Sequence, residues 1–421
     1  MNEIVNDKIK LLYPVYNGVA SGANYSINKE IYRGILYCTL LKNFSKSCLL
    51  NLNETVFSHK KTTNRTLTNL LSSWFFTLYH YYNFTDDPFF PTNYKYTDIL
   101  KKTIEDYCSM YTINNVQERI NKIIQDLLSN YNNVLTKLAE YTDKEPPITV
   151  IKIKINQQRE SIIIPFYRFI IDNNKYTITS NKLNNIINNI ILPIEQYNLM
   201  KKRYIELGIG DINSIDNLIW IILYRYQLLS SNNNQLAVLE SVLARMTTDF
   251  NLSCECFASS INSSFDNYCS IYYDVERYFG SIGSFFNITP IRGTYSFNPP
   301  YQYDIINNGI EKIIIDLDNT TFNLSFIITI PIWDIEGKEY MATNMTENNN
   351  NIIKYDDFGI INVIKQSKYF KGLRMISKDN FTYFDHNFYL FKNKTIQNTY
   401  VIIMSNYENN YIDKINLYNF V

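Results

Sequence analysis

Apolar residues recur every three to four positions along much of the first 140 residues, which is the pattern of helices with one buried face. Between 116 and 141 the isoleucines and leucines keep this spacing for several turns. The pattern predicts three helices, at 31–44, 67–82 and 116–141. Trp74, in the second of them, is interpreted as a core residue, with an aromatic stacking slot as the alternative.

The Pro-Pro pair at 146–147 ends the preceding helix, because proline cannot continue it. After this pair the pattern changes to runs of β-branched residues. Strands are predicted at 148–155, 161–171 and 175–179, and together they form a small meander within about 148–179. Helical spacing resumes at 181–195 and 213–229, and the Ser- and Asn-rich stretch at 230–234 predicts a loop. We therefore expect a mainly helical N-terminal domain over 1–234.

Helical and strand patterns alternate in the remainder of the chain. Helices are expected at 236–246, 261–273 and 303–317, and strands at 252–259, 294–298, 324–333 and 399–405. Such alternation predicts an α/β domain over 235–421 with a parallel sheet. Functional residues are then expected where the strands end.

Composition narrows the function classes. The 421 residues include 40 Lys and Arg, 40 Asp and Glu, and 15% aromatic residues. This excludes a disordered chain and a protein that is basic all over, so any nucleic-acid contact must come from a local patch. The prevalence of residues with AT-rich codons, such as Asn, Ile, Lys and Tyr, points to the genome and not to the function.

Metal, membrane and export signals are not recognisable. The 6 Cys and 3 His have no four-ligand metal spacing, so we expect no metal and reduced thiols. The N-terminus lacks an apolar signal segment, and Arg225 interrupts the longest apolar stretch, at 218–229. We expect an intracellular protein without a membrane span.

A chemical signal follows the strand expected at 294–298. Asn298, Pro299, Pro300 and Tyr301 lie between that strand and a helix. The adenine amine is a poor nucleophile because its lone pair is delocalised into the ring. The carbonyls of Asn298 and Pro299 can accept its two hydrogens, which directs the lone pair at a methyl donor, while Tyr301 stacks on the base. The alternative is an ordinary loop.

The expected strand at 252–259 lacks the Gly-x-Gly that often follows the first strand of a nucleotide-binding fold. In its place the small residues Ala258, Ser259 and Ser260 would let a ligand approach the backbone. A plain buried strand end is the alternative.

The span 252–301 resembles the phosphorylated-CTD-interacting factor family, the cap-specific adenosine N6-methyltransferases. The matching pieces follow one another in order: Glu255–Ser259 with Asn262, Tyr268–Ser270, Tyr278–Ser281, and Gly293 through Tyr301. Further matches extend the resemblance to about 210–406: Trp220, Arg225–Gln227, Leu324–Pro331 with Trp333, and Asn398-Thr399. Three positions depart from the family pattern, namely Ser260 for Pro, Tyr301 for Phe and Ile332 for Glu.

The resemblance implies an α/β fold with a Rossmann-like, S-adenosyl-L-methionine-dependent methyltransferase core packed against the N-terminal helical domain. It implies an mRNA (2′-O-methyladenosine-N6-)-methyltransferase, whose acceptor is an adenosine-starting capped mRNA. Asn298, Pro299, Pro300 and Tyr301 would hold the target adenine. The methyl donor would be lined by Glu255, Ala258, Ser259, Asn262, Gly280 and Ser281.

Structural interpretations remain beside these roles. Glu255 is alternatively a buried, hydrogen-bonded carboxylate, and Gly280 with Ser281 alternatively forms a turn. A strip of Lys365, Lys368, Lys371 and Arg374 is a candidate RNA contact, with a solvated face as the alternative.

Two other functions stay open. One is an N6-adenine methyltransferase acting on internal RNA or DNA, and the other is a catalytically silent scaffold that binds capped RNA. No WW domain is recognisable, so we expect a viral or protist member of the family. It would be cytoplasmic if viral, with the nucleus as the alternative.

Overall fold

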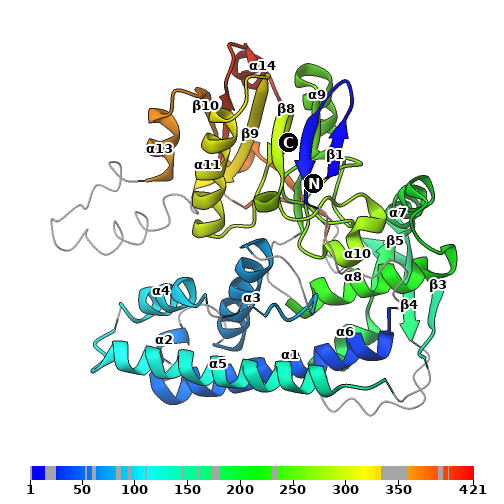
Figure 1. Ribbon diagram of the computed structural model, residues 1–421, viewed down its shortest axis with the longest axis vertical. Coiled ribbons are helices and arrows are strands. Elements are labelled where there is room, and N and C mark those ends of the chain that lie inside the picture. The colour runs from blue at the N-terminus through cyan, green and yellow to red at the C-terminus, as the bar shows by residue number, and fades with distance from the viewer. Residues whose placement is uncertain are drawn as a thin grey trace. The chain divides into compact units, whose positions relative to one another are not determined.

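The computed structural model describes most of the chain. The described residues are 2–14, 25–52, 55–58, 63–81, 87–92, 94, 96–109, 111–143, 147–159, 162–171, 181–229, 235–332, 359–386, 392–396 and 398–421. The chain divides into two compact units (Figure 1). The sheet unit comprises Met1–Val15, Asn233–Tyr273 and Gly280–Val421, and the helical unit comprises Tyr16–Asn232 and Asp274–Phe279.

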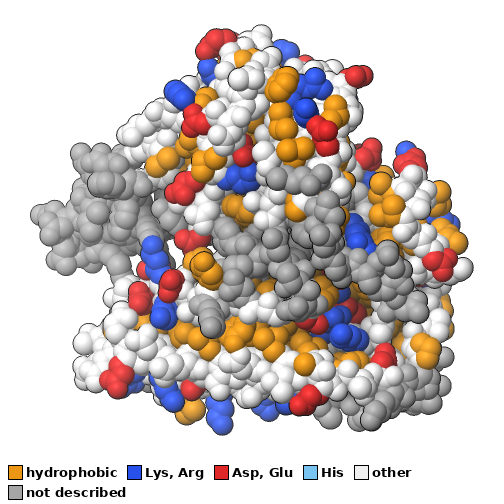
Figure 2. Space-filling view, viewed as in Figure 1, with side chains coloured by type: hydrophobic (Ala, Val, Ile, Leu, Met, Phe, Trp, Pro, Cys, Tyr) orange, Lys and Arg blue, Asp and Glu red, His pale blue; other side chains and the backbone are white. Residues whose placement is uncertain are grey.

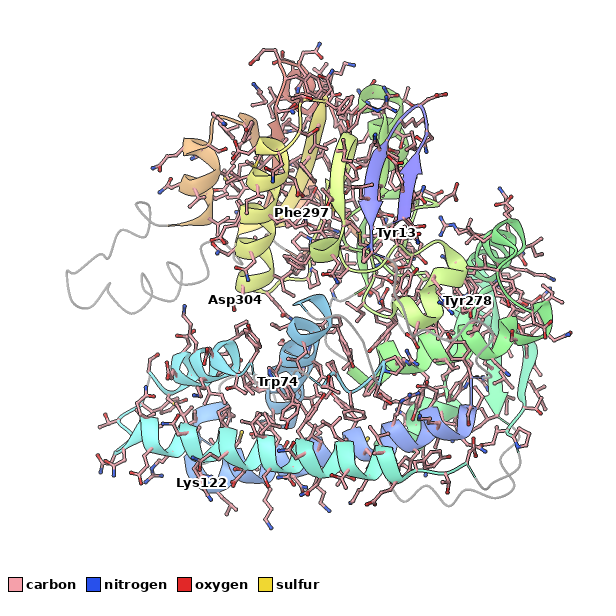
Figure 3. The ribbon with its side chains drawn as sticks, in the orientation of Figure 1. Tyr13, Trp74, Lys122, Tyr278, Phe297 and Asp304 are labelled. Atoms are coloured by element: carbon pink, nitrogen blue, oxygen red, sulfur yellow. The ribbon has the colours of Figure 1, made fainter. Side chains whose placement is uncertain are left out.

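The helical unit confirms the three helices predicted from the apolar spacing. They are α1 (Ile27–Leu52), α3 (Thr63–Tyr81) and α5 (Val116–Glu140), with the shorter α2 (Thr55–Ser58) and α4 (Asp98–Cys108) beside them. Helices α1 and α5 lie side by side (Figure 1). Trp74, labelled on α3 in Figure 3, is 1% exposed and donates its indole N–H to the Tyr96 carbonyl at 2.7 Å. It is a core residue, as interpreted from the sequence.

The small sheet of the helical unit is antiparallel, with the order β3 (Val150–Arg159), β4 (Ile162–Ile171) and β5 (Ile191–Pro193). The strand expected at 175–179 lies outside the described residues. The single helix expected at 181–195 is wrong. Helix α6 (Asn181–Asn188) ends first, β5 then pairs with β4, and α7 (Ile194–Leu207) begins after Pro193. The reason is burial in a sheet: Leu192 is 0% exposed and pairs with Tyr167.

Helix α8 (Ile215–Leu229) of the same unit follows a short 3-10 turn, η1 (Ile212–Ser214), and confirms the helix expected at 213–229. Its Arg225 is 0% exposed and forms ion pairs with Glu30 at 2.6 Å and Asp274 at 2.8 Å. Arg33 joins the same cluster through Glu30 and Asp87. Burial opposes ionisation of Glu30, but the two guanidinium groups hold its pKa below the ordinary value. Two guanidinium groups thus face three carboxylates inside the unit, and burial raises the pKa of one of them, Asp274, above its ordinary value.

The sheet unit is built on a mixed sheet with the order β1-β2-β8-β9-β13-β10, and β7 pairs with β8. The strands are β1 (Asn2–Val5), β2 (Lys10–Tyr13), β7 (Leu252–Glu255), β8 (Thr289–Phe297), β9 (Leu324–Pro331), β10 (Phe370–Ile376) and β13 (Thr399–Ser405). Strands β7, β8 and β9 run parallel, whereas β13 is antiparallel to both of its neighbours. The expectation of an all-parallel sheet is therefore wrong. The described residues between β10 and β13 contain no α-helix to cross the sheet, and β13 runs in the opposite direction to β10.

Helices cover both faces of this sheet. Helices α11 (Tyr303–Asp318) and α13 (Ile360–Gln366) pack over a core that contains Phe326. Helices α9 (Glu240–Phe250) and α14 (Tyr411–Asn416) pack over a second core that contains Ile327. Adjacent residues of one strand point to opposite faces, so the two cores lie on opposite sides of β9. The result is a three-layer α/β arrangement (Figure 1).

The first strands belong with this sheet and not with the helices that follow them. Strand β2 pairs with the first half of β8, and Gly293 makes the approach possible. At φ +116° a side chain is strained there, and a Cβ would lie 2.7 Å from the Lys8 carbonyl oxygen. Residues 1–15, which the sequence placed in the N-terminal helical domain, thus group with the sheet unit. The domain boundary between 234 and 235 stays a prediction.

Three elements near the start of the expected α/β domain also differ from the prediction. The helix expected at 236–246 begins with a strand, β6 (Leu236–Val238), and the strand expected at 252–259 ends at Glu255. No helix spans 261–273; only α10 (Tyr273–Glu276) forms at its end. Instead Tyr268 makes isolated parallel bridges to Glu255 and Ser281, so its backbone pairs with two distant segments and not within helical turns.

No described helix is long and apolar enough to cross a membrane. Among the described residues no cluster of three or more His, Cys, Asp or Glu side chains is arranged to hold a metal ion. Basic and acidic side chains are interspersed on the face drawn in Figure 2, which agrees with the formal net charge of zero.

Candidate active site

Two neighbouring parallel strands of the sheet unit end beside each other. Glu255, the last residue of β7, pairs with Ser296 of β8, and the Cys256 amide donates to the Ser296 carbonyl at 2.8 Å. Asn298 follows Ser296 by two residues. The fold therefore brings Glu255 and Asn298 to the same edge of the sheet, where ligands bind in open α/β sheets.

The Asn298 side chain is held on one side only. Its Nδ2 donates to the Leu236 carbonyl at 3.5 Å, while its Oδ1 is buried and has no hydrogen-bond partner among the described residues. The Pro300 carbonyl accepts from the Gln302 amide at 2.7 Å, which closes the turn. The Pro299 carbonyl receives no such bond within the described ranges. Two acceptor oxygens thus remain, the two that the sequence assigned to an adenine amine.

Tyr301 is half-buried, and its ring meets the Tyr383 ring edge-on, with 6.3 Å between centroids and 70° between planes. Tyr383 belongs to β11 (Tyr383–Asp385), which pairs with β6 and with β12 (Lys392–Lys394) in a separate three-stranded sheet. β6 also supplies the Leu236 carbonyl that holds Asn298. This three-stranded sheet therefore supports both ends of the Asn-Pro-Pro-Tyr turn, a role that the sequence did not reveal.

The turn after β7 is closed by its own side chains. The Ser259 amide donates to Asn262 Oδ1 at 2.7 Å, and the Ile261 amide donates to Ser259 Oγ at 3.2 Å. The Ala258 amide donates to the Cys269 carbonyl at 2.8 Å. Asn262 therefore has a structural task whatever else it binds. Donor contacts of Ala258, Ser259 and Asn262 stay a prediction.

The Glu255 carboxylate is 7% exposed, and its Oε2 accepts from the Ser264 amide at 2.9 Å. A buried carboxylate needs such a partner to stay ionised. This hydrogen bond matches the structural interpretation of Glu255, and a contact with a methyl donor stays a prediction beside it.

The local backbone conformation and hydrogen bonds explain why Gly280 and Ser281 stand at these positions. Gly280 has φ +105°, and a Cβ would lie 2.2 Å from the Asp266 carbonyl oxygen. Ser281 Oγ lies 2.7 Å from Ser270 Oγ and accepts from the Gly283 amide at 3.2 Å. The close backbone approach and the serine pair account for a turn here. A donor contact of these two residues stays a prediction.

The cysteines next to this edge are not arranged as nucleophiles. Cys254, Cys256 and Cys269 are 1% exposed or less. A hydrogen bond with Cys269 and burial raise the pKa of the Cys254 thiol well above its ordinary value, and burial does the same for Cys256. Protonated, buried thiols are poor nucleophiles, so the chemistry of this edge rests on oxygen and nitrogen groups.

The structure does not bring the four candidate RNA-contacting cations onto one element. Lys365 is exposed on α13, and Lys368 pairs with Asp318 at 2.7 Å in the turn that follows. Lys371 and Arg374 both belong to β10, but Lys371 lies where the register with β13 shifts, between Phe370 and Gly372. Lys371 pairs with a glutamate, Glu408, at 2.6 Å, and Arg374 donates to the Ile415 and Tyr418 carbonyls. RNA binding by these residues stays a prediction.

Sequence reasoning missed Gln235 at this edge. It is 5% exposed, and its Oε1 accepts from Ser259 Oγ at 2.8 Å. It directly precedes the β6 residue whose carbonyl holds Asn298. No motif marks a lone glutamine after an Asn-rich loop, so only the fold reveals it.

Comparison with known proteins places the same residues in a family context. Residues 200–357 match a family model described as "Phosphorylated CTD interacting factor 1 WW domain". The matched range contains β7, β8, β9 and the Asn-Pro-Pro-Tyr turn. The match supports a relationship to the phosphorylated-CTD-interacting factor family. The lack of a WW domain and a viral or protist source stay predictions.

Two curated mammalian proteins, each named mRNA (2′-O-methyladenosine-N(6)-)-methyltransferase, are similar to part of this chain. The Mus musculus protein is 32% identical over 121 residues, and the Homo sapiens protein is 31% identical over the same length. Each match covers 27% of this chain and 17% of the relative. The matched part thus spans about a sixth of the relatives' length.

Proposed function

We propose that this chain is an S-adenosyl-L-methionine-dependent methyltransferase that acts on the N6 amine of the 2′-O-methyladenosine next to the 7-methylguanosine cap of mRNA. The activity for which the two mammalian relatives are named supports this acceptor. The observation that carries the chemistry is the buried, unpartnered Oδ1 of Asn298 at the end of β8. An acceptor left without a partner costs about 1–3 kcal/mol, so a ligand that donates to it recovers that energy.

The proposed mechanism depends on two acceptors fixed before the substrate arrives. Asn298 Oδ1 and the Pro299 carbonyl would accept the two hydrogens of the adenine amine. This draws the nitrogen towards tetrahedral geometry and directs its lone pair away from the ring. Pro299 and Pro300 restrict φ, and the contact of Asn298 with Leu236 fixes the amide, so little reorganisation is needed. The Tyr301 ring would stack on the base.

The residues at the end of β7 fit a methyl donor of the S-adenosyl-L-methionine type. The buried Glu255 carboxylate is an acceptor for ribose hydroxyls or for an amino group, and the small side chains of Ala258 and Ser259 leave the backbone approachable. The donor supplies a sulfonium methyl group. Asn262, Gly280 and Ser281 complete the proposed set. Parallel strands with helices on both faces support a Rossmann-like core for the sheet unit.

The proposed RNA contacts are local because the chain is neutral overall. Lys365, Lys368, Lys371 and Arg374 would reach phosphates in part by exchanging Asp318 and Glu408 for them. We propose an intracellular protein, cytoplasmic if the chain is viral and nuclear as the alternative.

Incubation with tritiated donor tests the function. Four acceptors are compared: capped RNA that begins with 2′-O-methyladenosine, capped RNA that begins with guanosine, uncapped RNA and DNA. We expect incorporation on the first alone. Equal incorporation on A- and G-starting caps, or none, would contradict the proposal. Transfer to uncapped RNA or DNA would indicate an internal adenine, and donor binding without transfer would indicate a silent scaffold.

A further inference from the structure

Gln235 is held in place on three sides. Its Oε1 accepts from Ser259 Oγ at 2.8 Å, and its backbone carbonyl accepts from the His386 amide at 3.0 Å. The next residue, Leu236, pairs with Asp385 in the three-stranded sheet. The Ser259 hydroxyl, which also lies 3.0 Å from Asn262 Oδ1, connects the Gln235 amide to the turn after β7.

The other half of that amide has no partner. Gln235 is only 5% exposed, so its Nε2 is shielded from water. This atom nevertheless makes no hydrogen bond to any described residue. Proteins rarely leave such a donor unpaired, because it loses its hydrogen bonds to water on burial. At a sheet edge where ligands bind in open α/β folds, this unpaired NH2 group is a candidate donor to a ligand.

The position of this donor suggests which ligand. Gln235 binds Ser259 of the proposed donor turn, and the carbonyl of Leu236 holds Asn298 of the proposed acceptor turn. Consecutive residues thus place an unpartnered donor, Gln235 Nε2, and an unpartnered acceptor, Asn298 Oδ1, at one edge of the sheet unit. Adenine presents the complementary pattern, since its exocyclic amine donates and the ring nitrogens N1 and N7 accept.

We propose that Gln235 reads an adenine ring by donating from Nε2 to a ring nitrogen beside the exocyclic amine. The inference rests on the proposed function. Adenine enters that reaction from two sources, the target nucleoside and the methyl donor, and both present the same amine and ring nitrogens. Gln235 is then a binding residue that selects for the acceptor pattern of adenine, while Ser259 positions it.

The variant Gln235→Met keeps the length of the side chain and removes the donor. Its matched control is Gln227→Met, at a glutamine of α8 that is 7% exposed and likewise has buried side-chain atoms without described partners. Calorimetric titration gives the dissociation constants for S-adenosyl-L-methionine and for capped RNA on the full chain, and steady-state assays give KM and kcat. A thermal melt reports on stability.

We expect Gln235→Met to weaken one of the two ligands about five- to tenfold, as the loss of a single neutral hydrogen bond does. Weaker RNA binding with unchanged donor binding assigns the target adenine, and the reverse assigns the donor's adenine. Gln227→Met should change neither constant. RNA that begins with 1-deaza- or 7-deazaadenosine adds an atomic arm. The first analogue lacks N1 and the second lacks N7. If one of these nitrogens accepts from Gln235, RNA that lacks it binds the wild type more weakly than adenosine RNA does. Gln235→Met, which has already lost the donor, should bind both RNAs equally.

Unchanged dissociation constants for both ligands in Gln235→Met, with or without a change in melting temperature, would overturn the inference and leave a purely structural glutamine. The binding titrations decide this even without turnover. A wild-type chain that transfers no methyl group refutes the proposed function, whereas an active wild type with an indistinguishable variant refutes the role of Gln235 alone.

Discussion

Gly309 of α11 lies directly against the ring of Phe297 at the end of β8. A Cβ at residue 309 would come within 2.4 Å of Phe297 Cζ, and Phe297 is 0% exposed. Figure 3 labels Phe297 together with Asp304, which lies in the first turn of α11. The helix that follows the Asn-Pro-Pro-Tyr turn is therefore packed onto the residue that precedes it.

Gly309→Ala should destabilise the chain despite the better helix propensity of alanine. The methyl group gains about 1 kcal/mol of propensity but overlaps a buried ring, which costs about 1–3 kcal/mol or more because the ring has nowhere to move. We expect a lower urea midpoint and a reduced kcat, since a displaced Phe297 moves Asn298. Ile315→Ala on the same helix, where the side chain is 56% exposed, should be close to wild type. A Gly309→Ala chain with raised stability would contradict this packing.

Asn298→Ala should separate activity from stability. It removes the proposed transition-state acceptor, so kcat should fall about 10²–10³-fold. It also removes a buried, unpartnered Oδ1 at the cost of one long contact with Leu236, so the melting temperature should be unchanged or slightly raised. Tritium transfer and a thermal melt of the same sample check both statements. A clear loss of stability with retained kcat would mean that Asn298 is structural.

Arg225→Met should be among the most damaging changes in the helical unit. It leaves the carboxylates of Glu30 and Asp274 buried without their main cation, which costs about 3–5 kcal/mol. Arg245→Met is the matched control, because Arg245 is 49% exposed and pairs with Asp249 at 3.6 Å, and it should cost under about 1 kcal/mol. Urea unfolding followed by circular dichroism distinguishes the two. Equal losses of unfolding free energy in the two variants would show that the buried ion pairs of Arg225 matter no more than an exposed one.

Asp316 on α11 gives a pH dependence with a definite sign. Burial raises its pKa from 3.8 to about 6, and the ion pair with Lys312 at 2.7 Å only partly opposes this. The folded state therefore holds this proton more tightly than the unfolded state. The resulting stabilisation is present below about pH 4 and is lost as the pH rises through about 6.

The variant Asp316→Asn should consequently gain stability relative to the wild type between pH 4 and pH 7.5, by about 3 kcal/mol for a difference of two pKa units. Parallel urea titrations at four pH values measure the difference in the free energy of unfolding between the two proteins. Lys312→Met should move the transition to higher pH, because the opposing cation is gone. A gap that stays constant across the series would exclude Asp316 as its source.

The parts of the fold that the sequence predicted are those with a strong local signal. Helices α1, α3 and α5 carry several turns of apolar spacing, and β9 is rich in isoleucine and other strand-forming residues. The Asn-Pro-Pro-Tyr turn was found at a sheet edge because proline and the strand before it are both local features.

The parts that the sequence did not predict depend on distant partners. The three residues of β6 read as the start of a helix, and only their pairing with β11 makes them a strand. The segment around Tyr268 has the spacing of a helix, but it lies between Glu255 and Ser281 and pairs with both. Gln235 carries no pattern at all, and its significance comes from Ser259 and Asn298, which are far from it in sequence.

The pairing of β2 with β8 has a consequence for the synthesis of the chain. Tyr295 donates to the Lys10 carbonyl at 3.2 Å across 285 residues of sequence. At about 5–20 residues per second, β2 would wait roughly 15–60 s on the ribosome for its partner, with Leu11 (0% exposed in the folded protein) uncovered meanwhile. The helical unit is translated in this interval and can fold first. The sheet that carries the proposed site then closes last, which makes its early strand a natural client for a chaperone during translation.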